Sequence, residues 1–290
     1  MQKSILPILL AAAVVLGGCS GLAFGGNETP TQTVTPAAVP TDEPTPTPVP
    51  QLAPGLTGQG VVDPFALGDG HAAVLDNTSY TMQENFTVRY ANGTVVNGVT
   101  IRTQMASDSR FYLVQNGFGM NVRGSGGLSM WSNGERVLQA RASNGNTSYT
   151  SPRGVTGEPV PPQEAIGALG TDSTHKEQIY ELFGSVATRV TDREQRNGTT
   201  VYRVESTNVT NPTAFEGARW QNPRNFTMVA RIDSTGLVRE LRVNYTATVN
   251  DSTVRVHRRV RYTNLGNTTV KRPPWYDEAI ANVSATTTAG

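Results

Sequence analysis

Apolar and polar residues alternate along most of the chain between residues 80 and 263, and this two-residue period is typical of β-strands. The predicted strands are residues 80–90, 99–105, 111–114, 128–131, 137–142, 186–195, 199–206, 226–232, 237–249 and 253–263. Turn sequences separate them, among them Asn92-Gly93, Asn97-Gly98, Asn133-Gly134 and Asn197-Gly198. Each strand has one apolar and one polar face, which predicts an antiparallel sheet with one face in water.

Two segments follow the 3.6-residue period of amphipathic helices instead. The first begins at Asp63, a favoured N-cap residue, has Pro64 at its first helical position and ends near Asn77. Its apolar stripe consists of Leu67, His71, Val74 and Leu75. The second runs over residues 173–183 with Ser173 as its N-cap, and a short third helix starts at residues 273–275. The fold class is therefore mainly antiparallel β (α+β), a curved sheet or half-barrel with two to three helices packed on its concave face.

The first 18 residues have the features of a secretory signal peptide, with Lys3 ahead of a short apolar stretch. This segment runs into Leu16-Gly17-Gly18-Cys19, which resembles the lipobox of bacterial and archaeal lipoproteins. The resemblance implies cleavage before Cys19, attachment of lipid to its thiol and an anchor on the extracellular face of the cell membrane. An ordinary cleaved signal peptide is the alternative. Because Cys19 is the only cysteine, a disulfide framework is excluded.

The segment after the signal peptide differs in composition from the rest of the chain. Residues 19–60 contain repeated Thr-Pro pairs, and proline there prevents both helices and central strands. We expect this segment, with the lipidated cysteine at its start, to be a disordered stalk. A single β-rich globular domain is expected over residues 61–282, with a disordered tail over residues 283–290.

Charge and motif content exclude several function classes. The chain has 24 Lys and Arg against 23 Asp and Glu, which argues against nucleic acid as a partner. None of His71, His175 and His257 stands at ligand spacing to another histidine or to a carboxylate cluster, so no metal or other cofactor is expected. His71 lies on an apolar helix stripe and is expected to be a packed core residue. The chain contains no nucleophile-elbow, phosphate-loop or zinc-helix motif, so no enzyme is expected, although a catalytic pair assembled only by folding stays open.

Asparagine occurs far more often than chance in the N-glycosylation sequon Asn-x-Ser/Thr. Twelve of the 20 asparagines qualify, whereas the Ser and Thr content would give about four. The candidates in the folded part are Asn77, Asn85, Asn92, Asn146, Asn197, Asn208, Asn225, Asn244, Asn250 and Asn267. Asn85 and Asn244 fall on the polar phase of their strands. The alternative is that Asn-Gly-Thr and similar sequences serve only as turns.

Basic residues gather near the C-terminal end of the chain. Residues 219–272 contain 11 Lys and Arg but only three Asp and Glu. The polar face of the strand at 253–263 carries a stripe of Arg255, His257, Arg259 and Arg261. Such a stripe suits anionic lipid headgroups or an acidic surface polymer, and the alternative is a solvated face balanced by acidic neighbours.

Taken together, the lipobox, stalk and strand order resemble a family of haloarchaeal surface lipoproteins without an assigned function. The matching segments are Val62-Asp63-Pro64 with His71, residues 80–90 with Asn92-Gly93-Thr94, Trp131-Ser132-Asn133-Gly134, and residues 232–239 with their Asp-x-x-Gly-Leu-Val turn. This resemblance covers nearly the whole chain. The last turn and the helix–meander layout are also distantly similar to the lipoprotein-carrier superfamily, which implies a half-barrel that holds acyl chains between sheet and helices.

Two functions remain open on these observations. One is a lipid-anchored, non-catalytic binding module with an apolar groove for a lipid or another hydrophobic ligand. The other is a structural or adhesive surface-coat glycoprotein with a dry core. The residues expected to line the groove or core are Tyr80, Met82, Phe86, Val88, Tyr90, Ile179, Leu182, Phe183, Phe226, Met228, Leu241, Val243 and Tyr245. A ligand slot would be a cavity of at least ~300 Å³ that opens at one rim, whereas a core would be filled.

Overall fold

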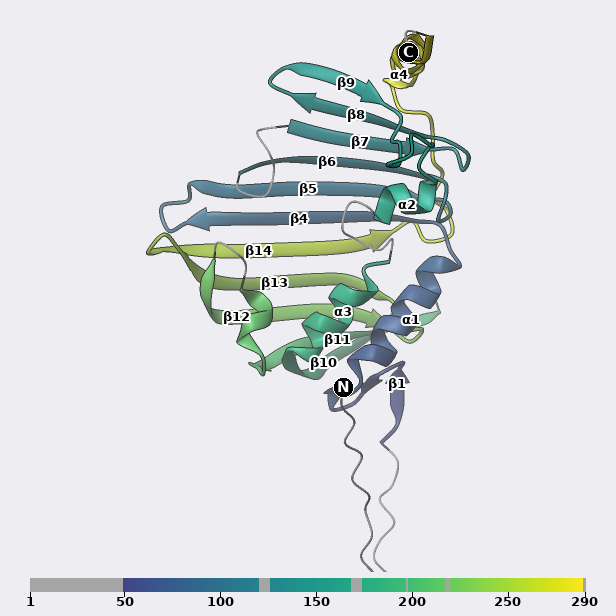
Figure 1. Ribbon diagram of the computed structural model, residues 1–290. Helices are drawn as coiled ribbons and strands as arrows, with labels where there is room; N and C mark the ends of the chain where they lie inside the picture. The colour runs from purple at the N-terminus through teal and green to yellow at the C-terminus, as the bar shows by residue number, and fades with distance from the viewer. Residues whose placement is uncertain (1–48, 120–125, 168–173, 197, 217–219, 289–290) are drawn as a thin grey trace, which may run out of the picture. The chain divides into compact units, whose positions relative to one another are not determined.

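Two antiparallel meanders share one eleven-stranded sheet in the computed structural model (Figure 1). The model describes residues 49–119, 126–167, 174–196, 198–216 and 220–288, all in the second of the two units into which the chain divides, residues 48–290. The predicted stalk and Cys19 lie outside the described residues. The first meander consists of β4 (Tyr80–Tyr90), β5 (Val95–Met105), β6 (Phe111–Gly119), β7 (Gly126–Ser132), β8 (Val137–Ser143) and β9 (Asn146–Thr150).

The second meander consists of β10 (Val186–Arg196), β11 (Thr199–Val209), β12 (Gln221–Asp233), β13 (Val238–Val249) and β14 (Ser252–Thr263). Its last strand, β14, pairs with β4, the first strand of the other meander, over ten residue pairs from Val254–Tyr90 to Thr263–Thr81. The strand order is therefore β10-β11-β12-β13-β14-β4-β5-β6-β7-β8-β9. The mainly antiparallel β fold class is confirmed.

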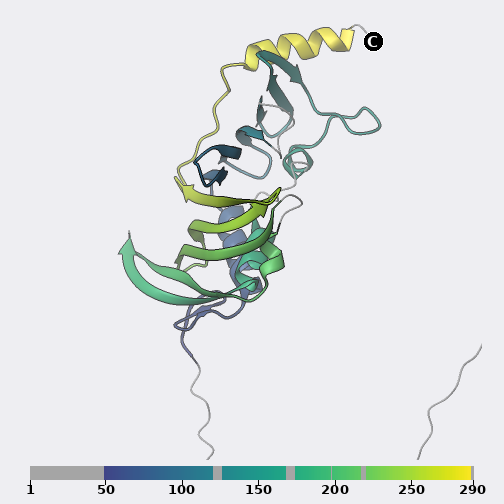
Figure 2. The same cartoon turned by 90° about the vertical axis from the view of Figure 1, so that its left-hand side faces the viewer.

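Helices α1 (Pro64–Asp76), α2 (Pro162–Gly167) and α3 (Lys176–Gly184) lie over one face of the sheet, which we call the inner face (Figure 1). Seen from the side, the sheet curves around α1 and α3 (Figure 2). Asp63 caps α1 as the sequence predicts, since its Oδ1 accepts a hydrogen bond from Ala66 N at 3.0 Å. The buried residues of α1 and α3, among them Leu67 and Ile179, join the apolar side chains of the inner face in one core.

The C-terminal helix α4 (Tyr276–Thr288) packs on the opposite face of the sheet, at the β7–β9 end. Strand register places Trp131, Leu138 and Tyr149 together on this outer face. Tyr276 of α4 meets the ring of Trp131 edge-on at 5.1 Å, and Trp275 stacks near Tyr149. This second, smaller core includes α4 residues as far as Val283, and the helix continues to Thr288. The prediction of a disordered tail from residue 283 is wrong to that extent.

The folded unit begins earlier than the predicted boundary at residue 61. Three short strands, β1 (Gln51–Ala53), β2 (Leu56–Thr57) and β3 (Gly60–Val61), form a small sheet of their own beside β10. Val61 N donates to Thr188 Oγ1 at 2.8 Å, which ties β3 to the edge of the large sheet. Gly60, at φ +118°, is required here because a Cβ would stand 2.3 Å from Thr188 O. Leu56 is fully buried, so these residues belong to the domain and not to the stalk.

Two local predictions need correction. Asn97-Gly98 lies within β5 instead of forming a turn, because the chain already reverses at Asn92-Gly93, where Gly93 has φ +89°. Helix α3 begins at Lys176 with His175 as its N-cap residue in a left-handed conformation, and Ser173 lies outside the described residues. Strand β9 and helix α2 fall in segments too short or too polar to have been predicted. The remaining predicted strands are present, most of them longer than predicted.

Candidate functional site

The apolar set expected to line a groove or core lies on the inner face and on α3. Much of it is packed and buried, namely Tyr80, Met82, Val88, Ile179, Phe183, Met228, Leu241 and Val243. Tyr80 and Tyr262 meet edge-on at 5.8 Å in this region, and His71 meets Tyr262 in the same way. Under α1 and α3 the inner face is therefore a filled core.

Beyond α3 the inner face opens into a pocket of about 240 Å³. The 3-10 helix η1 (Pro212–Phe215), α3, and strands β4, β13 and β14 surround it. From the predicted set, its lining includes Phe86, Leu182, Val243 and Tyr245. The remaining lining residues are Gln178, Glu181, Ala214, Phe215, Glu216, Trp220, Val256 and Arg258. The volume lies slightly below the ~300 Å³ expected of a ligand slot.

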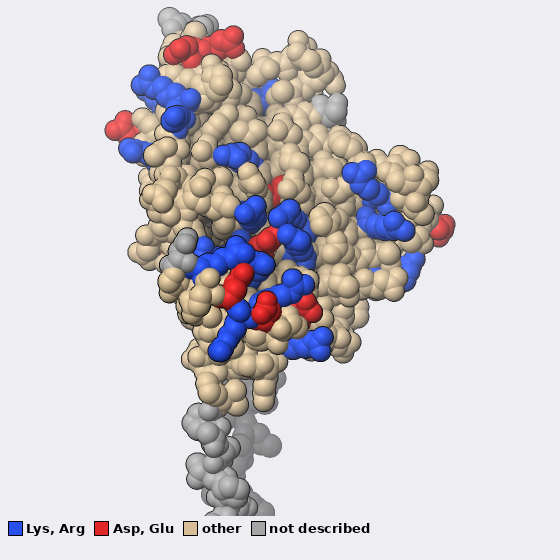
Figure 3. All heavy atoms as spheres, turned by 180° about the vertical axis from the view of Figure 1, so that it is seen from behind, with Lys and Arg blue, Asp and Glu red and all other residues tan. Residues whose placement is uncertain are grey.

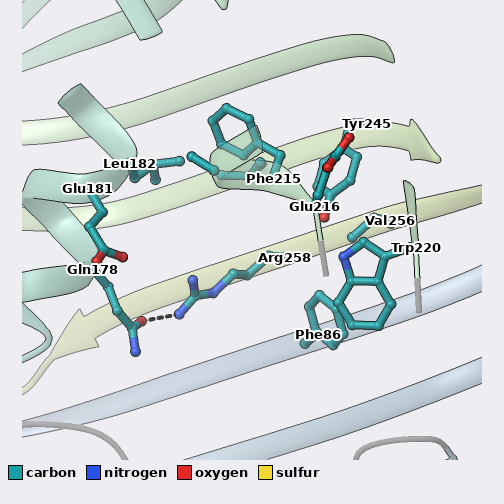
Figure 4. A pocket seen from close by; sticks show the side chains of 12 residues that line it. Phe86, Gln178, Glu181, Leu182, Phe215, Glu216, Trp220, Tyr245, Val256 and Arg258 are labelled. Carbon is teal, nitrogen blue, oxygen red and sulfur yellow. Dashed lines mark hydrogen bonds between the residues drawn. The ribbon is translucent and has the colours of Figure 1, made fainter. Parts of the chain in front are cut away.

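Aromatic rings form most of the apolar wall of this pocket (Figure 4). Phe86 and Trp220 lie against each other with ring centroids 5.7 Å apart. Phe226 stacks on Tyr245 at 6.3 Å and contacts Phe215 at 4.4 Å, so it supports the wall from behind. Burial raises the pKa of Tyr245 to about 12, which keeps its hydroxyl protonated at any physiological pH.

A charged pair lies beside the pocket on the apolar face of the sheet, and Arg258 is the member that lines the pocket. Arg258 donates from Nε to Glu84 Oε1 at 2.7 Å and from Nη2 to Gln178 Oε1. The Glu84 side chain is only 10% exposed and that of Arg258 is 28% exposed. Figure 4 shows Arg258 reaching from β14 toward Gln178 of α3. Sequence reasoning missed this pair, although each residue interrupts the apolar phase of its own strand, which is the signal that would have found it.

Segments that carry the family resemblance converge at the other end of the inner face. The β12–β13 turn is built on Asp233, which is 2% exposed and whose Oδ1 accepts from the backbone nitrogens of Thr235 and Leu237. Its Oδ2 accepts from Arg239 Nε at 2.8 Å. Gly236 completes the turn at φ +96°. This carboxylate therefore has a structural function in the turn.

His71 joins this turn to helix α1. Its Nδ1 accepts a hydrogen bond from Val238 N at 3.1 Å, so the ring proton is on Nε2, which donates to Thr174 O at 2.9 Å. Burial lowers the pKa of His71 to about 3, and the nearby His175 adds to the effect. A neutral imidazole with both nitrogens bonded is a packed core residue, as the sequence indicates.

The predicted basic stripe lies on the outer face of the sheet. Arg259 and Arg242 share Glu240, each with a nitrogen 2.7 Å from its Oε1. Figure 3 shows basic and acidic side chains side by side over the centre of this face. Arg255 and His257 instead line a hollow of about 410 Å³ near one end of β14. Glu240 therefore balances the stripe at Arg259, whereas no acidic residue among those described lines the hollow that contains Arg255 and His257.

The predicted glycosylation sites are all on the surface wherever the structure describes them. The exposed sequon asparagines are Asn77, Asn85, Asn92, Asn146, Asn208, Asn225, Asn244, Asn250 and Asn267. Asn197 lies outside the described residues. The fully buried Asn97 is not in a sequon.

No helix in the described part of the chain combines the length and apolar character needed to cross a bilayer. Among the same residues, no three His, Cys, Asp or Glu side chains stand close enough together to hold a metal ion.

Comparison with known proteins places the chain in a family. Residues 4–279 match the family of unknown function DUF7537, and the chain belongs to that family. No curated protein sequence matches the chain significantly.

Several solved structures are similar to this chain at low identity. LprF from Mycobacterium bovis is 12% identical, with 72% of this chain and 96% of that chain covered and a TM-score of 0.35. Lipoprotein LppX from Mycobacterium tuberculosis is 9% identical, with 71% and 96% covered and a TM-score of 0.32. A LolA superfamily protein from Nitrosomonas europaea is 7% identical, with 71% and 93% covered and a TM-score of 0.25.

Proposed function

We propose that this protein is a lipid-anchored glycoprotein of the cell surface whose sheet domain binds a hydrophobic or amphiphilic molecule without catalysing a reaction. The inner-face pocket carries the proposal, because it is open to solvent and walled by Phe86, Phe215, Trp220 and Tyr245. Concave sites with apolar walls and a few polar groups are typical of small-molecule binding. Arg258 and Gln178 supply such polar groups at one side.

The size of the pocket limits its ligand. Its volume of about 240 Å³ lies below the ~300–1,000 Å³ of pockets that hold drug-sized ligands. A space of this size takes a single ring system or part of one acyl chain. It is too small for a whole lipid with two long chains. The ligand we propose is therefore small, or it enters the pocket with one chain only.

Filling the pocket from its rim tests this proposal. Ala214 is exposed and lines the pocket, so Ala214→Trp adds a large side chain without disturbing the core. We expect the variant to bind the neutral fluorescent probe N-phenyl-1-naphthylamine at least about tenfold more weakly than the natural protein, because the apolar surface is no longer available to it. Fluorescence titration measures the change.

The matched control is Ala73→Trp, at an exposed alanine of α1 that does not line the pocket. It should bind the probe as the natural protein does. If all three proteins bind the probe equally weakly, and the protein extracted from its native membrane has no lipid by mass spectrometry, the surface-coat function with a dry core is the better one.

The proposed lipid anchor depends on Cys19, and the proposed glycans depend on the exposed sequons. A thioether-linked lipid with two long chains anchors stably, since each buried CH₂ contributes ~0.8 kcal/mol. We expect native protein to be heavier than its bare chain by the mass of the lipid and the glycans. Cys19→Ser should move it from the membrane to the medium, and Asn244→Gln should remove one glycan mass. Thr31→Ala and the non-sequon variant Asn116→Gln are the controls. An unmodified intact mass would contradict both proposals.

A further inference from the structure

A second hollow lies on the outer face of the sheet, across it from the pocket, and Tyr245 and Val256 line both. It has a volume of about 410 Å³ and is lined by side chains from β4, β12, β13 and β14. Two arginines, Arg89 and Arg255, stand in it together with His257. Its other polar groups include the amides of Asn225 and Asn244. In Figure 3, basic side chains gather at the side where β4 ends and β14 begins, and acidic ones lie only at the outer rim of that group.

Among the described residues, no carboxylate forms an ion pair with Arg89 or Arg255. Arg89 and Arg255 stand directly opposite each other in the β4–β14 register. Like charges in that position destabilise a sheet. None of the described residues that line the hollow is acidic, whereas the Glu240 carboxylate balances arginines further along the same face. Arg89 Nη1 donates to Gly93 O at 3.3 Å, which uses one of its five N–H donors.

The chemistry of the lining points to a particular class of ligand. Guanidinium groups bind carboxylates and sulfates with paired hydrogen bonds. Asn225 Nδ2 donates to Thr246 Oγ1 at 3.3 Å, and Thr246 Oγ1 donates to Arg224 O at 3.0 Å. The Asn225 amide still has its oxygen and a second N–H, which suit sugar hydroxyls. His257 Nδ1 and Asn244 Oδ1 are 2.6 Å apart, so this part of the wall is already ordered. A hollow of this volume also falls within the range of small-ligand sites.

We propose that this hollow binds an acidic saccharide, with Arg89 and Arg255 contacting its carboxylate or sulfate group. A recessed site suits a group that projects from a sugar chain better than it suits a flat layer of headgroups. Because the site faces away from the pocket, its test is independent of the function proposed above. Asn225 and Asn244 are themselves sequon asparagines, so the saccharide has two sources: a separate polymer or a glycan on this chain.

Calorimetric titration of the full chain, produced without glycans, tests the ligand class. Trigalacturonate supplies carboxylates on a saccharide, its methyl ester supplies the same saccharide without charge, and phosphatidylglycerol vesicles supply headgroups. We expect trigalacturonate to bind at least about tenfold more tightly than the ester, which lacks the charge-assisted hydrogen bonds. Its affinity should also fall between 50 mM and 500 mM NaCl, because salt screens exposed charges.

Variants locate the site. Arg89→Gln with Arg255→Gln should weaken trigalacturonate binding at least about tenfold. The matched control is Arg102→Gln with Arg261→Gln, which removes two exposed arginines of the same face on either side of Gln83 and should leave binding unchanged. Equal binding of acid and ester, equal loss in both double variants, or binding to vesicles alone would overturn the proposal.

The glycosylated native chain distinguishes the two sources. If it binds trigalacturonate as tightly as the bare chain, the hollow takes a separate polymer. If it binds only after enzymatic removal of its glycans, a glycan of the chain itself occupies the hollow. Both results support the site.

Discussion

Replacing Arg258 by methionine should lower the free energy of unfolding by about 3 kcal/mol, because it leaves a buried carboxylate without its cation. Glu84 is 10% exposed, and Arg258 is its ion-pair partner at 2.7 Å. An unpaired charge in such a place costs far more than the pair itself contributes. Urea denaturation without ligand measures the change.

The double variant Glu84→Leu with Arg258→Met provides the decisive comparison. Removing both charges should restore most of the stability lost in Arg258→Met, since nothing charged is then left buried. On the outer face, Arg242→Met breaks a pair with Glu240 in which the arginine is half exposed, and it should cost less than about 1 kcal/mol. If Arg258→Met costs no more than Arg242→Met, the buried pair does not stabilise the fold as described.

Lowering the pH from 7 to 5 should destabilise the domain by about 2 kcal/mol through His71 alone. Its pKa in the folded protein is about 3, whereas histidine in an unfolded chain titrates near 6.5. Below pH 6.5 the unfolded state therefore takes up a proton that the folded state does not. The contribution of His71 is complete above pH 6.5 and is lost progressively as the pH falls toward 3, at about 1.4 kcal/mol per pH unit.

His71→Gln removes the titrating group but keeps one acceptor and one donor. Its unfolding free energy should depend less steeply on pH between 7 and 5, a range that lies above the titration of most carboxylates. Asn116→Gln is the control, because it replaces an exposed residue that carries no titrating group and should leave the slope unchanged. A His71→Gln slope equal to that of the natural protein would contradict a buried neutral imidazole.

Local periodicity predicted most of the fold, because each strand pairs mainly with its sequence neighbours. Alternation in residues 80–90 and 237–249 located β4 and β13, and the cap at Asp63 located α1. Prediction failed where contacts with residues distant in the sequence override the local preference of a segment. Asn97-Gly98 has turn chemistry, yet its backbone pairs with β4 on one side and β6 on the other. Helix α4 is polar for much of its length and is fixed by Trp131 and Leu138, far away in the chain.

The two sites were harder to find than the fold. Phe86 and Tyr245 were predicted on the inner face, but whether they close a core or leave a pocket depends on η1 and Trp220, whose positions no periodicity determines. The Arg89–Arg255 pair depends on the register between two strands that are distant in sequence. The sequence predicted the basic stripe of Arg255, His257, Arg259 and Arg261. It did not predict that Glu240 would pair with Arg259 while Arg255 and His257 line a hollow.

The pairing of β14 with β4 has a consequence for biosynthesis. Among the described residues, the backbone hydrogen bonds between the two meanders are all at this seam, and Glu84 and Arg258, which cross it, are 174 positions apart. The first meander is made early, yet the open edge of β4 has no partner until residue 263 has left the ribosome. Unpaired strand edges beside apolar side chains promote aggregation. We therefore expect a chain truncated before β14 to aggregate instead of folding as a smaller stable domain.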